Sequence, residues 1–201
     1  MIYSDDKVID LLWDRADSSI VDATFTAIPL NYVFEDGSSL LFKCCALGMN
    51  KFSEWLIDNG ANLNFTDKDL NTVLHISSYS SSAVVVKKII ERNVIYIDTQ
   101  NIIGQTPLMI AAKGSRIDNT IALLKENPAV NMRDATGNTP MHWALTEKNP
   151  PEIMLDVLVA LKNNGADLKN KNYIGLTPLD YLNICQTWGD EYSILLKIIT
   201  R

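Results

Sequence analysis

The sequence predicts an all-α solenoid in which similar helix pairs stack one on the next. A short motif recurs along the chain: LNTVLHISS, GQTPLMIAAKG, GNTPMHWAL and GLTPLDYL begin at Leu70, Gly104, Gly137 and Gly175, and a weaker copy, GSSLLFKCCALG, begins at Gly37. Consecutive copies start 33 to 38 residues apart. A second signature, seen as NGANLN, RNVIYID, NPAVN and NGADLK, follows each of the first four starts. Self-similarity at such a period is typical of helical repeat proteins.

Each copy of the motif is predicted to start a short inner helix. Threonine at a helix N-cap accepts a hydrogen bond from the backbone, and proline at the first helical position has a suitable φ and lacks a donor that would go unpaired. The pairs Thr106-Pro107, Thr139-Pro140 and Thr177-Pro178 fit this pattern. Small residues follow in each copy, such as Ala111 and Ala112. They are expected to let neighbouring inner helices pack closely.

An outer helix is predicted to follow each inner one, because segments such as IALLKEN and IMLDVLVALKN carry apolar residues at helical spacing. The polar stretch up to the next motif is expected to form a hairpin-like turn that projects to one side. The fourth copy is the longest, and its extra residues fall at TEKNPPE. Since proline cannot continue a helix but can start one, we expect a lengthened loop here, with Pro151 beginning the outer helix.

These residues resemble the ankyrin repeat, whose pattern runs G-x-T-P-L-H-x-A-A, then an apolar outer helix, then G-A-D-x-N. The segment GMNKFSEWLIDNGANLN (Gly48–Asn64) follows the second half of this pattern nearly position for position. The resemblance covers Gly37 to Arg201 and implies an ankyrin repeat solenoid of about five repeats in one continuous domain. The implied repeats span residues 37–69, 70–103, 104–136, 137–174 and 175–201.

Residues 1–36 lack the motif and are expected to form degenerate capping helices, the first from SDDKVIDLLWDRA and its partner from SSIVDATFTAI. This segment carries eight acidic and two basic residues, whereas residues 37–201 carry 16 of each. Proteins that bind nucleic acid need a basic surface to neutralise phosphates. The charge distribution therefore argues against a nucleic-acid partner.

The sequence also bears on localisation. No apolar stretch approaches the length of a membrane-spanning helix, and the N-terminus MIYSDDKVIDLL has acids where a signal peptide has a basic start. The three cysteines, Cys44, Cys45 and Cys185, form neither a zinc motif nor a disulfide framework, which fits a reducing compartment. We expect a cytoplasmic protein without a membrane partner. A secretion route other than Sec could still carry it into a host cell.

Neither histidine indicates an active site. His75 and His142 occupy the histidine position of the motif, where the resemblance implies that the imidazole bonds the preceding Thr and a neighbouring turn. Cys44, Cys45 and Cys185 fall at positions expected in the core. No phosphate-binding loop, nucleophile elbow or metalloprotease motif is present. We expect no catalytic residue, cofactor or metal, and therefore a protein that is not an enzyme.

The resemblance implies that a partner protein is bound by the hairpin tips and by the exposed, concave face of the inner helices. Two tips, NIIGQ and NYIGL, carry apolar residues that a solvent-facing turn does not need. Either they form an exposed patch, or Ile102 or Ile174 folds back onto a neighbouring repeat. The candidate partner-binding residues are Tyr79, Ile102, Ile103, Gln105, Lys113, Thr136, Asn138, Trp143, Tyr173, Ile174 and Leu176.

The sequence thus predicts a non-catalytic protein-binding module, monomeric on its own. Its richness in Ile and Asn favours an AT-rich genome, such as that of an intracellular bacterium or a virus. We expect a bacterial or viral effector, or an adaptor or inhibitor. The alternatives are an immunity protein that neutralises a cognate toxin and a regulatory subunit of an enzyme. The resemblance further implies that Asn64 and Asn131 are candidates for hydroxylation.

Overall fold

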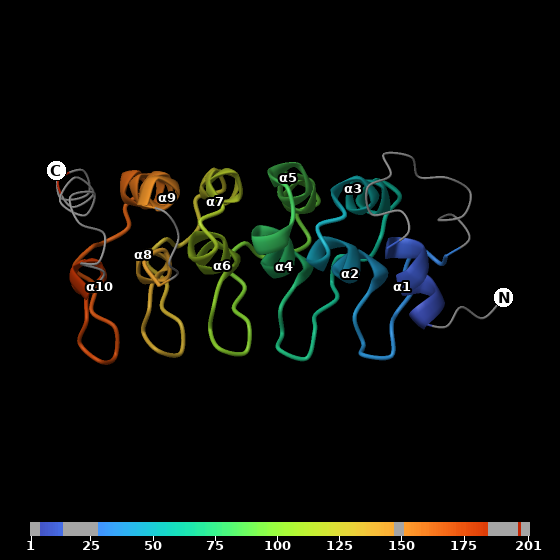
Figure 1. Ribbon diagram of the computed structural model, residues 1–201, viewed down its shortest axis with the longest axis horizontal. Helices are drawn as coiled ribbons and strands as arrows, with labels where there is room; N and C mark the ends of the chain where they lie inside the picture. The colour runs from blue at the N-terminus through green and yellow to red at the C-terminus, as the bar shows by residue number, and fades with distance from the viewer. Residues whose placement is uncertain (1–4, 14–27, 147–150, 185–196, 198–201) are drawn as a thin grey trace. The chain divides into compact units, whose positions relative to one another are not determined.

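The computed structural model describes residues 5–13, 28–146, 151–184 and 197. The chain divides into two compact units, Met1–Tyr96 and Ile97–Arg201. Every helix or strand assigned in the described residues is an α-helix, which confirms the predicted all-α repeat class. Within each unit, hairpin turns project from the inner helices on the side away from the outer helices (Figure 1).

The first unit contains α1 (Asp5–Trp13) and two helix pairs. The inner helices are α2 (Leu40–Ala46) and α4 (Val73–Ser80), and the outer ones are α3 (Asn50–Asp58) and α5 (Ala83–Glu91). Inner helix packs on inner helix and outer on outer, so each apolar face is covered by the next pair. Leu40, Leu56, Leu74 and Ile89 are fully buried there.

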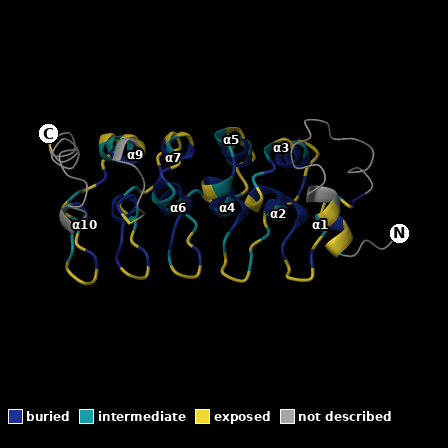
Figure 2. Cartoon of the chain, in the orientation of Figure 1, coloured by how far each residue is buried: buried dark blue, intermediate teal, exposed yellow. Residues whose placement is uncertain are grey.

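The second unit repeats this arrangement. Its inner helices are α6 (Pro107–Lys113), α8 (Pro140–Trp143) and α10 (Pro178–Ile184), and its outer helices are α7 (Ile117–Leu124) and α9 (Pro151–Asn163). Helix α8 packs between α6 and α10, and α7 packs on α9. In both units the facing sides of the helices are buried, and exposed residues gather at the hairpin tips and on the outer helices (Figure 2).

The predicted helix starts are confirmed. Pro107, Pro140 and Pro178 are the first residues of α6, α8 and α10, and Pro151 begins α9. The side chain of Thr106 accepts a hydrogen bond from the backbone N–H of Met109 at 3.3 Å. Such caps provide acceptors for backbone N–H groups that would otherwise lack a hydrogen-bond partner at a helix start.

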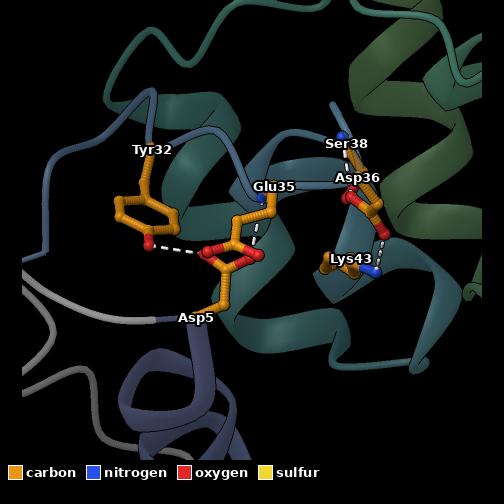
Figure 3. Close-up of polar contacts among 6 residues, drawn as sticks. All are labelled: Asp5, Tyr32, Glu35, Asp36, Ser38 and Lys43. Carbon is orange, nitrogen blue, oxygen red and sulfur yellow. Dashed lines mark hydrogen bonds and ion pairs between the residues drawn. The ribbon is translucent and has the colours of Figure 1, made fainter.

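Helix α1 is attached to the first hairpin by Asp5, its first residue. One carboxylate oxygen of Asp5 accepts a hydrogen bond from the Tyr32 hydroxyl, and the other accepts one from the backbone N–H of Glu35, each at 2.7 Å (Figure 3). The bond to Asp5 raises the pKa of Tyr32 to about 12. Beside this contact, Asp36 forms an ion pair with Lys43 of α2. Polar contacts therefore position the N-terminal helix.

Some predictions fall outside the described residues. They are Cys185, the expected helix SSIVDATFTAI except for its last residue, and residues 147–150 of the lengthened loop. Among the residues that are described, no helix has both the length and the apolar character needed to cross a membrane.

Candidate protein-binding surface

Three hairpin tips of the second unit are built in the same way. They are Asn101–Gln105, Asp134–Asn138 and Asn172–Leu176, and each begins with Asn or Asp. In each tip, one side-chain oxygen of that first residue accepts two backbone N–H bonds from the residues two and four positions later. Asn and Asp favour such turns because their short side chains reach the nearby backbone. The tip conformation is thus fixed locally by one residue per repeat.

Neighbouring tips are also joined to each other through the backbone. The N–H of Ala135 donates to the carbonyl oxygen of Ile103, and the N–H of Tyr173 donates to that of Thr136, both at 3.0 Å. Below these bonds, the buried side chains of Asn138 and Asn172 are hydrogen-bonded at 2.9 Å. The three tips therefore form one connected layer.

Gly137 allows the last two tips to approach closely. Its φ of +80° favours glycine, and a Cβ atom there would lie 2.7 Å from the backbone nitrogen of Tyr173 and 2.8 Å from its ring. No side chain fits at these distances without displacing the neighbouring tip. The ring of Tyr173 consequently rests against the backbone of the preceding tip.

The apolar tip residues point into solvent. Ile102 is 61% exposed, Ile103 50%, Tyr173 68% and Ile174 75%. The alternative in which Ile102 or Ile174 packs back onto a neighbouring repeat is therefore not what the structure shows. We call the exposed side chains of Ile102, Ile103, Thr136, Tyr173 and Ile174 the tip surface.

Three other candidate residues on the tips are less accessible. Gln105 and Asn138 are buried, and Leu176 is partly buried. The backbone of Gln105 donates to Asn101, the side chain of Asn138 accepts from Asn172, and the carbonyl oxygen of Leu176 lies against His142. These three residues contribute to hairpin structure.

On the inner helices, Lys113 and Trp143 lie together. The Lys113 ammonium lies 5.2 Å from the centre of the Trp143 ring, which is a cation–π distance. The indole N–H donates to Asp134 at 2.7 Å, so α8 is tied to its own hairpin. Tyr79 lies on α4 of the first unit and is exposed.

His142 joins two repeats, as predicted. The backbone N–H of Thr139 donates to its Nδ1 at 3.1 Å, which leaves Nε2 to donate to the carbonyl oxygen of Leu176 at 3.1 Å. Burial lowers the pKa of His142, consistent with a neutral ring. His75 receives the equivalent bond from Thr72. Both ring nitrogens of His142 are occupied, so it lacks a free position for a substrate or metal.

The described cysteines are core residues. Cys44 and Cys45 are fully buried, and burial raises the pKa of both thiols, that of Cys45 to about 11. A reactive cysteine instead needs exposure and a lowered pKa. Across the described ranges, no group of three or more His, Cys, Asp or Glu residues is arranged to hold a metal ion.

Sequence reasoning missed the basic residues beside the tip surface. Arg133 and Lys171 stand immediately before Asp134 and Asn172, and Lys169 lies two residues earlier; all three are exposed. Aligning the hairpins by their first Asn or Asp would have revealed that Arg133 and Lys171 occupy the same position in adjacent copies.

Comparison with known proteins places these features in a family. The family described as "Ankyrin repeats (3 copies)" matches residues 85–172. Over 135 residues the chain is 26% identical to an ankyrin repeat protein of Rickettsia bellii, covering 66% of this chain and 71% of that protein. It is 30% identical over 140 residues to alpha-latrotoxin-Lt1a of Latrodectus tredecimguttatus, and 32% identical over 119 residues to inversin of Gallus gallus. These two matches cover 64% and 59% of this chain but only 10% of each relative.

Proposed function

Because the chain is an ankyrin repeat protein, and such repeats imply a protein-binding module, we propose that it binds a partner protein through the tip surface of its second unit. Lys113 and Trp143 on the adjacent inner helices extend the contact. No catalytic step is part of the proposal. Tyr79 provides a separate contact from the first unit.

The exposure of four large apolar side chains on connected turns carries this proposal. A turn gains little folding energy from an isoleucine or tyrosine whose side chain is mostly exposed to water. Exposed apolar patches commonly mark protein interfaces, and tyrosine is a frequent anchor within them. Since the tips are hydrogen-bonded to one another, little conformational entropy is lost when a partner binds.

The similarity to a bacterial ankyrin repeat protein over most of that protein's length favours a bacterial effector, adaptor or inhibitor. We place its action in the cytoplasm, either of the producing cell or of a host cell.

The test compares affinity-tagged wild type with the double variant Ile103→Glu/Ile174→Glu in capture from lysate, with mass spectrometry of the bound proteins. We expect one stoichiometric partner with wild type and none with the variant, because each glutamate places a charge in the apolar contact. Thermal unfolding should be unchanged, since both side chains face solvent.

The matched control is Ile121→Glu/Ile153→Glu, which charges two exposed isoleucines on the outer helices α7 and α9. This control should retain the partner. If the tip variant also retains it, the tip surface is not the binding site. If the tip variant unfolds, those isoleucines contribute to the core and the proposal is wrong.

A further inference from the structure

We propose that the tip surface selects a partner segment in which acidic side chains accompany apolar ones. This inference rests on the proposed function and names the chemistry of the partner. The observation behind this inference is the charge around the apolar tips. That charge is positive, whereas the chain as a whole is negative.

The three exposed basic residues, Arg133, Lys169 and Lys171, all lie on hairpins that bear the tip surface. None of them forms an ion pair with a residue that the structure describes. Lys171 does interact with Asp180, whose pKa is lowered mainly by hydrogen bonds from Thr177 and also by the Lys171 charge. The charges of Arg133 and Lys169 are therefore available to a partner, and that of Lys171 is shared with Asp180.

Among the acidic residues of the same hairpins, Asp134 is already engaged. Asp134 is buried, and its two oxygens accept hydrogen bonds from Trp143, from the backbone and hydroxyl of Thr136, and from the backbone of Asn138. Its charge is compensated within the turn, so it presents no carboxylate to a bound segment. Asp167, which accepts a hydrogen bond from the backbone of Lys169, is exposed beside the three basic residues, so the exposed charge near these tips is positive on balance.

The tips of the first unit have the opposite character. Glu35 and Asp69 are exposed there beside Lys68, and Asp36 is paired with Lys43. The whole chain carries a net charge of −6. The basic character is thus local to the apolar tips, and charges on a protein surface act mainly within about 8–10 Å at physiological salt. An acidic partner would be attracted at this place.

The arrangement also limits the length of the segment. Packed helices lie about 8–10 Å apart, so three connected hairpins extend over roughly 20 Å. An extended chain rises about 3.3 Å per residue, and a segment of about six residues spans that distance. Its apolar side chains would cover Ile103, Tyr173 and Ile174, while its carboxylates would pair with Arg133 and Lys171. Arginine can bind a carboxylate through two parallel hydrogen bonds.

The experiment selects a phage-displayed library of random peptides on the full chain. Selection on the Ile103→Glu/Ile174→Glu variant removes peptides that bind elsewhere. We expect the enriched peptides to combine Asp or Glu with aliphatic or aromatic residues. Their affinity, measured by fluorescence anisotropy, should fall by about tenfold or more in Arg133→Glu/Lys171→Glu and should weaken as salt is raised.

The control Lys87→Glu/Lys125→Glu makes the same charge change at two exposed lysines of the outer-helix layer, and it should leave peptide affinity unchanged. Enrichment of basic or uncharged peptides, an empty selection, or equal affinity after charge reversal at the tips would each overturn the inference. So would binding of a labelled single-stranded oligonucleotide that is lost in Arg133→Glu/Lys171→Glu, since the basic residues would then serve a nucleic acid.

Failure of this inference can be told apart from failure of the proposed function. If partner capture depends on Ile103 and Ile174 but not on Arg133 and Lys171, the tip surface is the binding site and only the acidic character of the partner is wrong. If capture depends on neither pair, both are wrong.

Discussion

The Nε2 atom of His142 lies 3.1 Å from the carbonyl oxygen of Leu176, which is 34 residues further along the chain. The same ring accepts a hydrogen bond from the backbone of Thr139 at the start of its own helix. One side chain therefore caps α8 and also holds the hairpin that follows. In the last inner helix the equivalent residue is Asp180, which caps α10 by accepting the same bond from Thr177. A carboxylate can reproduce the cap but has no donor for a further hairpin.

Replacement of His142 should weaken the fold and spare the tip surface. We expect His142→Ala to lower the free energy of unfolding by about 1–2 kcal/mol, because it leaves buried groups of Thr139 and Leu176 without partners. Urea unfolding followed by circular dichroism would measure this. Partner capture at a temperature where the variant stays folded should match wild type. Lost capture with unchanged stability would instead give His142 a direct role in binding.

The lowered pKa of His142 predicts a loss of stability in mild acid. Its pKa in the folded chain lies below the unfolded value of about 6.5, since burial disfavours the charged ring. As pH falls through about 6.5, the unfolded chain takes up the proton first, so the free energy of unfolding decreases until the folded pKa is passed. Wild type and His142→Ala should therefore differ most above about pH 6.5 and converge toward lower pH. A difference that is constant with pH would contradict this.

Thr120 offers a stabilising change. Its hydroxyl is buried in α7 without a hydrogen-bond partner, and the equivalent position of α5 holds the fully buried Val86. Thr120→Val keeps the shape of the side chain and removes an unpaired polar group, so we expect the free energy of unfolding to rise by about 1 kcal/mol. The reverse change, Val86→Thr, should lower it. Chemical denaturation of both variants tests the pair, and a loss of stability in Thr120→Val would mean that the hydroxyl is satisfied by bound water.

Local signals made much of the fold predictable. Thr106-Pro107 and Thr139-Pro140 start helices because capping depends on two adjacent residues, and the interval between motifs then sets the position of each hairpin. The direction of a tip side chain depends on the neighbouring repeat instead. The motif alone did not show that the third residue of a turn, such as Ile174, is exposed while the fifth, such as Asn138, is buried and bonded to the next hairpin.

Prediction from the sequence is limited in the same way for the surface charges. Arg133 and Lys171 are far apart in the sequence, and neither belongs to a recognisable motif. The sequence alone therefore does not indicate that they lie on neighbouring hairpins. Bonds between adjacent tips, including that from Tyr173 to Thr136, bring their hairpins together. The tip surface is therefore a property of three repeats in contact, whereas the motif that predicts each repeat is contained within one.

Leu70 provides a test of backbone strain at a tip. It has a φ of 60° and is half exposed, whereas the equivalent residues of the other copies are glycines, such as Gly104 at 79°. A left-handed conformation costs a residue with a side chain about 1–2 kcal/mol, and glycine avoids that cost but is more flexible when unfolded. We therefore expect Leu70→Gly to raise the free energy of unfolding by up to about 1 kcal/mol, measured by urea denaturation. The matched change Gly104→Leu should be strongly destabilising, because its Cβ would also lie 2.8 Å from the backbone nitrogen of Ala135. If Leu70→Gly lowers stability instead, the leucine side chain gains more from packing on the first unit than its backbone loses.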